Sequence, residues 1–148
     1  MKNILVATDL KEHSDFLINV AESYGHAFNA RLWIIHIAAP DPDFVGYDVG
    51  PQYIRDIRAE DLREEHQALY SKTQQLKEKG LDAEGLLIQG STVETLLGEA
   101  KKLNGDLVVI GKADHGFFYN LIYGDTTSNI VKESPIPVLI VPFPAVNQ

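Results

Sequence analysis

Residues 106–141 read DLVVIGKADHGFFYNLIYGDTTSNIVKESPIPVLIV. A short apolar run rich in β-branched residues stands near each end of this stretch, at 107–110 and at 138–141. Continuous runs of this kind are typical of strands that are buried on both faces, as in parallel sheets. An irregular segment begins at Gly111, and a short helix is predicted over 126–132 before Pro135 and Pro137 return the chain to a strand.

The rest of the chain repeats this alternation of apolar runs and amphipathic stretches. Further strands are predicted at 4–7, 32–37 and 86–88, and helices over 14–25, 59–79 and 90–104. Ser14 is the expected N-cap of the first helix, and residues 39–51, with three prolines and two glycines, are expected to form a loop. This order predicts a single α/β domain over residues 1–148: a doubly wound five-stranded, mostly parallel sheet with helices on both faces.

The composition excludes several classes of function. The 148 residues contain 13 Lys and Arg against 21 Asp and Glu, which gives a net charge of −8. Phosphates of nucleic acids and of anionic membranes would repel such a chain, so neither is an expected partner. Cysteine is absent, which excludes disulfides, a thiolate nucleophile and Cys-ligated zinc. No apolar run approaches the roughly 20 residues that a bilayer requires, so we expect a cytoplasmic protein.

The candidate ligand site lies where the predicted strands end. In an open α/β sheet, the carboxyl ends of the strands and the following helix N-termini line one crevice, which binds ligands. Free N–H groups of helix N-termini would favour an anion there, and glycines such as Gly111 and Gly124 would let a ligand approach the backbone. The same glycines are also typical of ordinary turns, and neither a P-loop nor a Rossmann fingerprint is present.

Three segments resemble the universal stress proteins, a family of the adenine-nucleotide-binding α/β group. The opening KNILVATD resembles the first strand of the family, which ends in an Asp, here Asp9. WIIHI resembles the second strand, which ends in a His and an aliphatic residue, here His36 and Ile37. Residues 106–141 resemble the C-terminal strand, loop, short helix and proline-flanked last strand. The likeness covers nearly the whole chain.

The resemblance implies a binding site for ATP or AMP. Asp9 and Ile37 would contact the ribose and the adenine. Residues around the phosphates would be Gly111, Gly124, Thr126 and Thr127. Of these, Asp9, Ile37, Gly111 and Gly124 match the family motifs directly, and the two threonines are neighbours that could supply hydroxyls.

Two carboxylates depart from the phosphate motif of the ATP-binding members. That motif is Gly-x-x-Gly, nine residues, and then Gly followed by Ser or Thr; here Asp114 replaces the second glycine and Asp125 the Ser or Thr. A carboxylate about 4 Å from a phosphate costs about 1–4 kcal/mol at effective dielectric constants between 80 and 20. Lys112 in the same loop could offset one carboxylate. Mg²⁺, expected only together with a nucleotide, could offset both. Asp125 would also suit a helix N-cap.

Three functions therefore remain open. The first is a stress-response binding protein that senses or buffers an adenine nucleotide. The second is a slow ATPase or self-phosphorylating enzyme, for which His115 is the only candidate general base. The third is a nucleotide-independent interaction protein, which Asp114 and Asp125 favour. No catalytic residue and no metal site of the protein's own is assigned, because the histidines lack ligand spacing. His36 is expected to be a satisfied core residue.

Assembly is expected through the last strand. By the resemblance, residues 138–141 form an edge of the sheet, and an exposed apolar edge is a template for pairing with another copy. Since a two-fold dimer is the commonest closed assembly, we expect a homodimer through residues 137–143. The aromatic residues at 117–119 and 123 would face solvent, the domain's own surface or an unknown protein partner.

Overall fold

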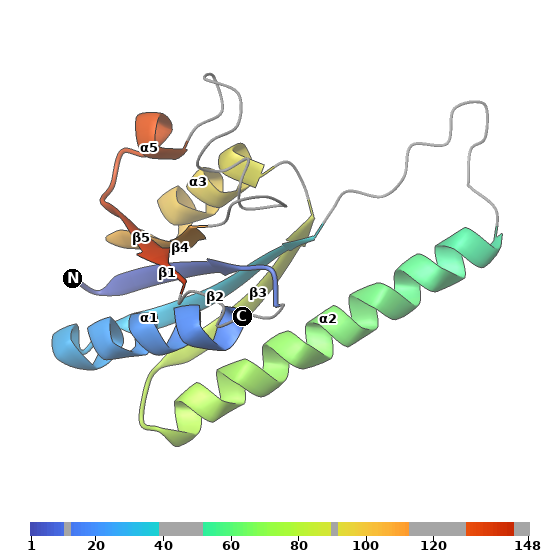
Figure 1. The fold of residues 1–148 in the computed structure, drawn as a ribbon, viewed down its shortest axis with the longest axis horizontal. Coiled ribbons are helices and arrows are strands. Elements are labelled where there is room, and N and C mark those ends of the chain that lie inside the picture. The colour runs from blue at the N-terminus through green and yellow to red at the C-terminus, as the bar shows by residue number, and fades with distance from the viewer. Residues whose placement is uncertain (11–12, 39–51, 90–91, 113–129, 144–148) are drawn as a thin grey trace, which may run out of the picture.

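The computed structural model describes residues 1–10, 13–38, 52–89, 92–112 and 130–143, in which strands and helices alternate along the chain (Figure 1). The strands are β1 (Asn3–Thr8), β2 (Arg31–Ala38), β3 (Ala83–Gln89), β4 (Leu107–Lys112) and β5 (Val138–Pro142). The helices are α1 (Ser14–Phe28), α2 (Gln52–Glu78), α3 (Thr92–Lys102) and α5 (Ile130–Glu133).

All five strands belong to one parallel sheet with the order β3-β2-β1-β4-β5. The central strand β1 pairs with β2 on one side and with β4 on the other. The inner strands are almost entirely buried, whereas β3 and β5 are largely half-buried. This confirms the predicted fold class. The expectation that every apolar run is buried on both faces is wrong for the edge strands, because each of them has a neighbour on one side only.

The helices cover both faces of the sheet, which completes the doubly wound arrangement (Figure 1). α1 and α2 pack on one face, where their buried side chains include Leu17 and Leu69. α3 and α5 pack on the other face, where theirs include Leu96 and Ile130. None of the described helices is long and apolar enough to cross a membrane.

The start of α1 differs from the prediction by one residue. The main-chain carbonyl of His13 accepts the N–H of Leu17 at 3.1 Å, so His13 is the N-cap and Ser14 is the first helical residue. Ser14 is buried against the rest of the protein, whereas the side chain of His13 makes no capping hydrogen bond. The prediction of Ser14 as the cap is therefore wrong. The helix also continues past Gly25 to Phe28 and ends at Asn29, whose φ is +51°.

α2 begins at Gln52, seven residues earlier than the sequence pattern predicted. The prediction used the stripe of side chains that face the sheet, but a helix can continue beyond the layer it packs on, because its hydrogen bonds are internal. At 27 residues, α2 is about 40 Å long at 1.5 Å per residue. Figure 1 shows it running well past the carboxyl ends of the strands. α5 starts at Ile130, and residues 126–129 of the predicted helix lie outside the described residues.

A glycine lets α2 lie close to β3. A Cβ built on Gly85 would lie 2.8 Å from Oγ1 of Thr73 and 2.9 Å from Cγ of Leu69. Both neighbours are buried, and the Thr73 hydroxyl donates to the Leu69 carbonyl at 2.8 Å, so neither can move freely. The missing side chain at Gly85 therefore sets how closely this helix approaches the sheet.

The opposite, amino-terminal edge of the sheet is fixed by Asp106. One oxygen of its carboxylate accepts the main-chain N–H of Lys2 at 2.7 Å and that of Asn3 at 2.9 Å. These two hydrogen bonds lower the pKa of Asp106 below its usual value. They join the start of β1 to the residue that precedes β4, so this edge has a structural role.

Replacing Gly85 by Ala should destabilise the protein by about 1–3 kcal/mol, because the added methyl group pushes α2 away from β3. Gly98→Ala is the matched control, since Gly98 lies inside α3 and a Cβ there would meet nothing within 4 Å. The control should stabilise the protein by about 0.5–1 kcal/mol through its higher helix propensity. Urea unfolding at constant pH measures both free energies. Equal effects of the two substitutions would contradict the close approach at Gly85.

The position of β5 generates a second prediction. Because β5 is an edge strand and is largely half-buried, we propose that two copies of the chain pair through residues 137–143. Sedimentation at micromolar concentration should then give about twice the chain mass of 16.4 kDa. A mass of one chain that does not change on further concentration would rule this dimer out.

Candidate functional site

The candidate site lies at the carboxyl edge of the sheet, between the ends of β1 and β4. These two strands are hydrogen-bonded neighbours, and Val6 pairs with Val109 near their ends. The helix that follows β1 packs on one face of the sheet, and α5, which follows β4 in the chain, packs on the other. Chains that leave in opposite directions create the crevice in which open α/β sheets bind ligands.

The backbone turns sharply where β1 ends. Thr8 is buried, and its Oγ1 accepts the N–H of Leu10 at 3.0 Å. Leu10 has a φ of +59°, a conformation that costs a bulky residue about 1–3 kcal/mol. The turn places Asp9 between the buried Thr8 and this strained residue. Asp9 therefore lies directly at the carboxyl end of β1.

Ile37, Gly111 and Lys112 reach the same edge from the two neighbours of β1. Thr8 pairs with His36; Asp9 directly follows Thr8 at the end of β1, and Ile37 is the next residue of β2. Ile37 is buried on the α3 side of the sheet. Gly111 and Lys112 end β4, where they pair with the last residues of β5, and Lys112 is exposed. The structure thus brings these four predicted residues to one edge.

The other predicted residues cannot be placed. Gly124, Asp125, Thr126 and Thr127 lie outside the described residues, as do the carboxylate of Asp114 and the imidazole of His115. In the part of the chain that the structure describes, no three His, Asp or Glu side chains gather closely enough to hold a metal ion.

His36 connects this edge to α2. Its Nδ1 lies 3.0 Å from the carbonyl oxygen of Thr8, and because a carbonyl only accepts, Nδ1 carries the proton and donates. Its Nε2 lies 3.3 Å from Oε2 of Glu65, but the two atoms form no hydrogen bond, and neither has another hydrogen-bond partner. His36 is buried and its Nδ1 is hydrogen-bonded, as expected for a core histidine. The expectation that all its polar atoms have hydrogen-bond partners is wrong for Nε2.

The ring of Phe143 occupies the space beside Gly111. From the sequence, we expected a ligand to approach this glycine. A Cβ built on Gly111 would lie 2.2 Å from Cζ of this ring, so the aromatic side chain lies directly on the glycine. Phe143 also stacks on His13, with ring centroids 4.4 Å apart and an angle of 14° between the planes. Sequence reasoning missed both this contact and Glu65. The alternation along β4 assigns Gly111 to the α1 face, but no local pattern indicates which side chain lies there.

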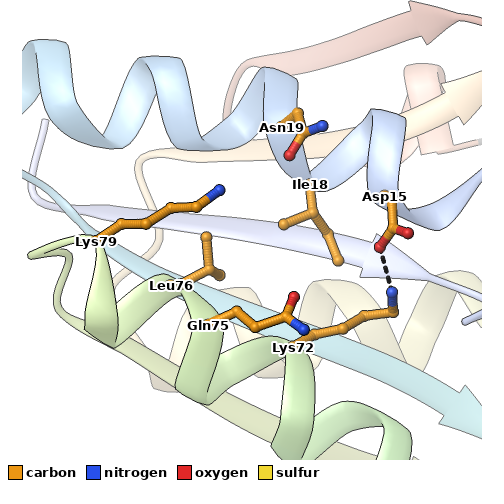
Figure 2. A pocket seen from close by; sticks show the side chains of 7 residues that line it. All are labelled: Asp15, Ile18, Asn19, Lys72, Gln75, Leu76 and Lys79. Atoms are coloured by element: carbon orange, nitrogen blue, oxygen red, sulfur yellow. Dashed lines mark hydrogen bonds and ion pairs between the residues drawn. The ribbon is translucent and has the colours of Figure 1, made fainter.

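A separate groove of about 220 Å³ runs between α1 and α2 (Figure 2). Lys72 of α2 reaches Asp15 at the start of α1, and Lys79 contacts Glu22 at 3.2 Å. The spacing of seven residues is the same in both segments, and Lys79 lies one residue beyond the end of α2. These ion pairs link the two segments across the groove, and their charges neutralise one another. The groove is therefore a weaker candidate for a ligand site than the carboxyl edge of the sheet.

Comparisons with known proteins agree with this architecture. A sequence model of the Universal stress protein family matches residues 1–142. The universal stress protein encoded in the QAH/OAS sulfhydrylase 3′ region of Thermus aquaticus is 32% identical over 142 residues, which cover 95% of this chain and 98% of that protein.

Among the solved structures that share the fold are two from the universal stress protein family. The universal stress protein UspA of Lactobacillus plantarum superposes with a TM-score of 0.76 at 18% identity, covering 95% of this chain and 97% of that one. A universal stress protein family protein of Arabidopsis thaliana, solved with AMP bound, gives a TM-score of 0.63 at 16% identity, covering 98% and 94%.

The contact between His36 and Glu65 can be tested by two substitutions. Glu65→Ala should lower the free energy of unfolding by about 1 kcal/mol, because Nε2 of His36 then stays buried without its neighbour. Glu65→Gln should stay within about 0.5 kcal/mol of the parent, since an amide N–H can donate to the lone pair on Nε2. Urea unfolding measures both.

Glu64→Ala is the matched control for these substitutions, because Glu64 is the exposed neighbour of Glu65 on the same helix. It should change the free energy of unfolding by less than about 0.5 kcal/mol. If Glu65→Ala has no larger effect than this control, the contact with His36 contributes nothing to stability.

Proposed function

The chain belongs to the universal stress protein family, and from this membership we propose that it is a cytoplasmic stress-response protein that binds an adenine nucleotide, AMP or ATP, and acts through binding rather than turnover. The observation that carries the proposal is the strand order, which reverses between β1 and β4 at the position where this fold class holds ligands. The AMP bound to the Arabidopsis relative supports the choice of nucleotide.

Each residue at the crevice has a role in this proposal. The carboxylate of Asp9 accepts hydrogen bonds from ribose hydroxyls, and Ile37 forms an apolar surface beneath the adenine. The backbone of Gly111 approaches the phosphates, and the exposed ammonium group of Lys112 attracts them. In this proposal Gly124, Thr126 and Thr127 complete the phosphate site, and Asp125 stands at the Ser or Thr position of the family's phosphate motif.

The number of phosphates should decide the affinity. Asp114 and Asp125 add two negative charges to the phosphate loop, where each carboxylate costs about 1–4 kcal/mol if it lies about 4 Å from a phosphate. The family pattern has uncharged residues at both positions. We therefore propose that AMP is preferred over ATP in the absence of Mg²⁺, and that Mg²⁺ narrows the difference by bridging carboxylates and phosphates.

The two carboxylates also favour a second candidate, a nucleotide-independent protein that acts through its homodimer and an unknown protein partner. Because this candidate requires no ligand in the crevice, a direct binding measurement separates the two functions.

Isothermal titration calorimetry with adenosine, AMP and ATP, with and without Mg²⁺, tests the proposal. AMP should bind, and it should bind no more weakly than Mg²⁺-free ATP. The double substitution Asp114→Gly with Asp125→Ser should raise the affinity for ATP at least about tenfold, or about 1.4 kcal/mol, while the affinity for adenosine stays nearly constant.

Two outcomes would contradict this proposal in different ways. If the parent and the double variant bind none of the three ligands, the nucleotide-independent function is correct. If the parent and the double variant bind ATP equally well, the carboxylates of Asp114 and Asp125 do not repel the phosphates. Loss of ATP binding on adding a chelator would then identify a site that uses the carboxylates through Mg²⁺. Glu133→Gln and Glu78→Gln, which remove two charges elsewhere, control for the change in net charge.

A further inference from the structure

Two acceptor atoms face each other between β2 and α2. Nε2 of His36 and Oε2 of Glu65 lie 3.3 Å apart, and neither forms a hydrogen bond with any residue that the structure describes. The side chain of His36 is only 7% exposed, so its nitrogen has little access to water. Buried polar atoms are almost always partnered, because leaving them unpaired is unfavourable. A cation that binds both atoms would satisfy them together.

The tautomer of His36 leaves Nε2 available to such a cation. Its Nδ1 donates to the carbonyl oxygen of Thr8 at 3.0 Å, so the lone pair of the ring lies on Nε2. Histidines that bind metal ions almost always donate their other N–H to a carbonyl or a carboxylate, because this hydrogen bond orients the ring and makes the binding nitrogen more basic. The Thr8 carbonyl therefore holds His36 in the arrangement of a metal ligand.

Glu65 lies on the face of α2 that packs on the sheet. It follows Leu62 by three residues and precedes Leu69 by four, the spacings that keep side chains on one face of a helix. Leu69 is buried in the core on this side of the sheet. The Glu65 side chain is 31% exposed, so an ion and its water molecules can reach the carboxylate from solvent.

The distance between the two atoms matches that of two ligands on one metal ion. A tetrahedral zinc ion binds imidazole nitrogen and carboxylate oxygen at about 2.0–2.2 Å, which places two such ligands about 3.4 Å apart. The observed separation of 3.3 Å agrees with this value. One imidazole and one carboxylate favour Zn²⁺ and related transition-metal ions over Mg²⁺ and Ca²⁺, which prefer oxygen ligands alone.

We propose that His36 and Glu65 bind a divalent transition-metal ion, Zn²⁺ or one with similar ligand preferences, and that water molecules complete its coordination. The ion links β2 to α2, and through the Thr8 carbonyl it also supports the turn where β1 ends. With two protein ligands among the described residues, the ion is exchangeable rather than permanently held.

This metal site is separate from the proposed nucleotide site. Side chains alternate along a strand, so His36 shares a face with Ile34, which is buried on the side of α1 and α2. Ile37 is buried on the opposite side, with α3. The inference therefore goes beyond the proposed function and does not depend on it.

Calorimetric titration of ZnCl₂ into the untagged, chelator-treated protein tests the site. The parent should bind one Zn²⁺ per chain, and Glu65→Gln should lower the affinity at least about tenfold, because losing only the hydrogen-bond partner of a ligand already costs about 10–100-fold. Glu64→Gln is the matched control: it removes the same charge from the exposed neighbour of Glu65, and the affinity should change less than about twofold.

Thermal unfolding gives a second readout. Zn²⁺ at about tenfold above its Kd should raise the melting temperature of the parent by about 3–6 °C, because the ion binds the folded chain. Mg²⁺ should cause no such rise. His36→Asn keeps an amide N–H for the Thr8 carbonyl but removes Nε2, so Zn²⁺ should not raise its melting temperature, whatever the starting value.

Three results would overturn the proposal. If the parent binds no Zn²⁺, a proton or a water molecule rather than a metal ion compensates the two atoms. If Glu65→Gln binds Zn²⁺ as tightly as the parent, or if His36→Asn keeps the rise in melting temperature, the ion binds elsewhere. Loss of binding in His66→Asn would then identify an adventitious surface site at this exposed histidine. None of these results affects the proposed nucleotide function, because the titrations with AMP require no zinc.

Discussion

The central constraint on this molecule is that β1 has a parallel, hydrogen-bonded neighbour on each side. A strand in this position is shielded from water along both edges, and β1 is buried on both faces from Ile4 onward. The chain can turn only beyond its carboxyl end, and it does so within two residues. The hydrogen bond from the Leu10 N–H to Thr8 and the positive φ of Leu10 are consequences of this short turn. The strand order reverses between β1 and β4, and α1 and α5 pack on opposite faces of the sheet.

Apolar packing, rather than charge, holds the helices on this sheet. Burying one leucine contributes about 1.5–3 kcal/mol, whereas an exposed ion pair contributes about 0–1 kcal/mol. The pairs of Lys72 with Asp15 and of Lys79 with Glu22 are partly exposed, so their contribution belongs to the lower range. The matched spacing of the two ion pairs favours one alignment of α1 along α2. In an acidic protein, this arrangement also engages two of the few cationic side chains.

Gly111 illustrates how one residue can satisfy two different requirements. A glycine at the end of β4 is what a phosphate-binding backbone needs, and it is equally what the ring of Phe143 needs. The first requirement belongs to a ligand and the second to the folded chain. Because both select the same residue, the presence of glycine does not distinguish them. The edge-on and stacked contacts of Phe143 with α1 show that packing alone already explains the glycine in this structure.

The amino-acid sequence by itself determined the alternation of strands and helices, the α/β class and the edge that carries Asp9, Ile37, Gly111 and Lys112. These features follow from local periodicity, because a strand or a helix imposes its repeat on the residues within it. Tertiary structure alone decided the approach of Glu65 to His36 and the ring of Phe143 on Gly111. Each of these depends on segments far apart in the chain, and the distance between such segments is set by how helices and strands pack, which no local pattern of side chains encodes.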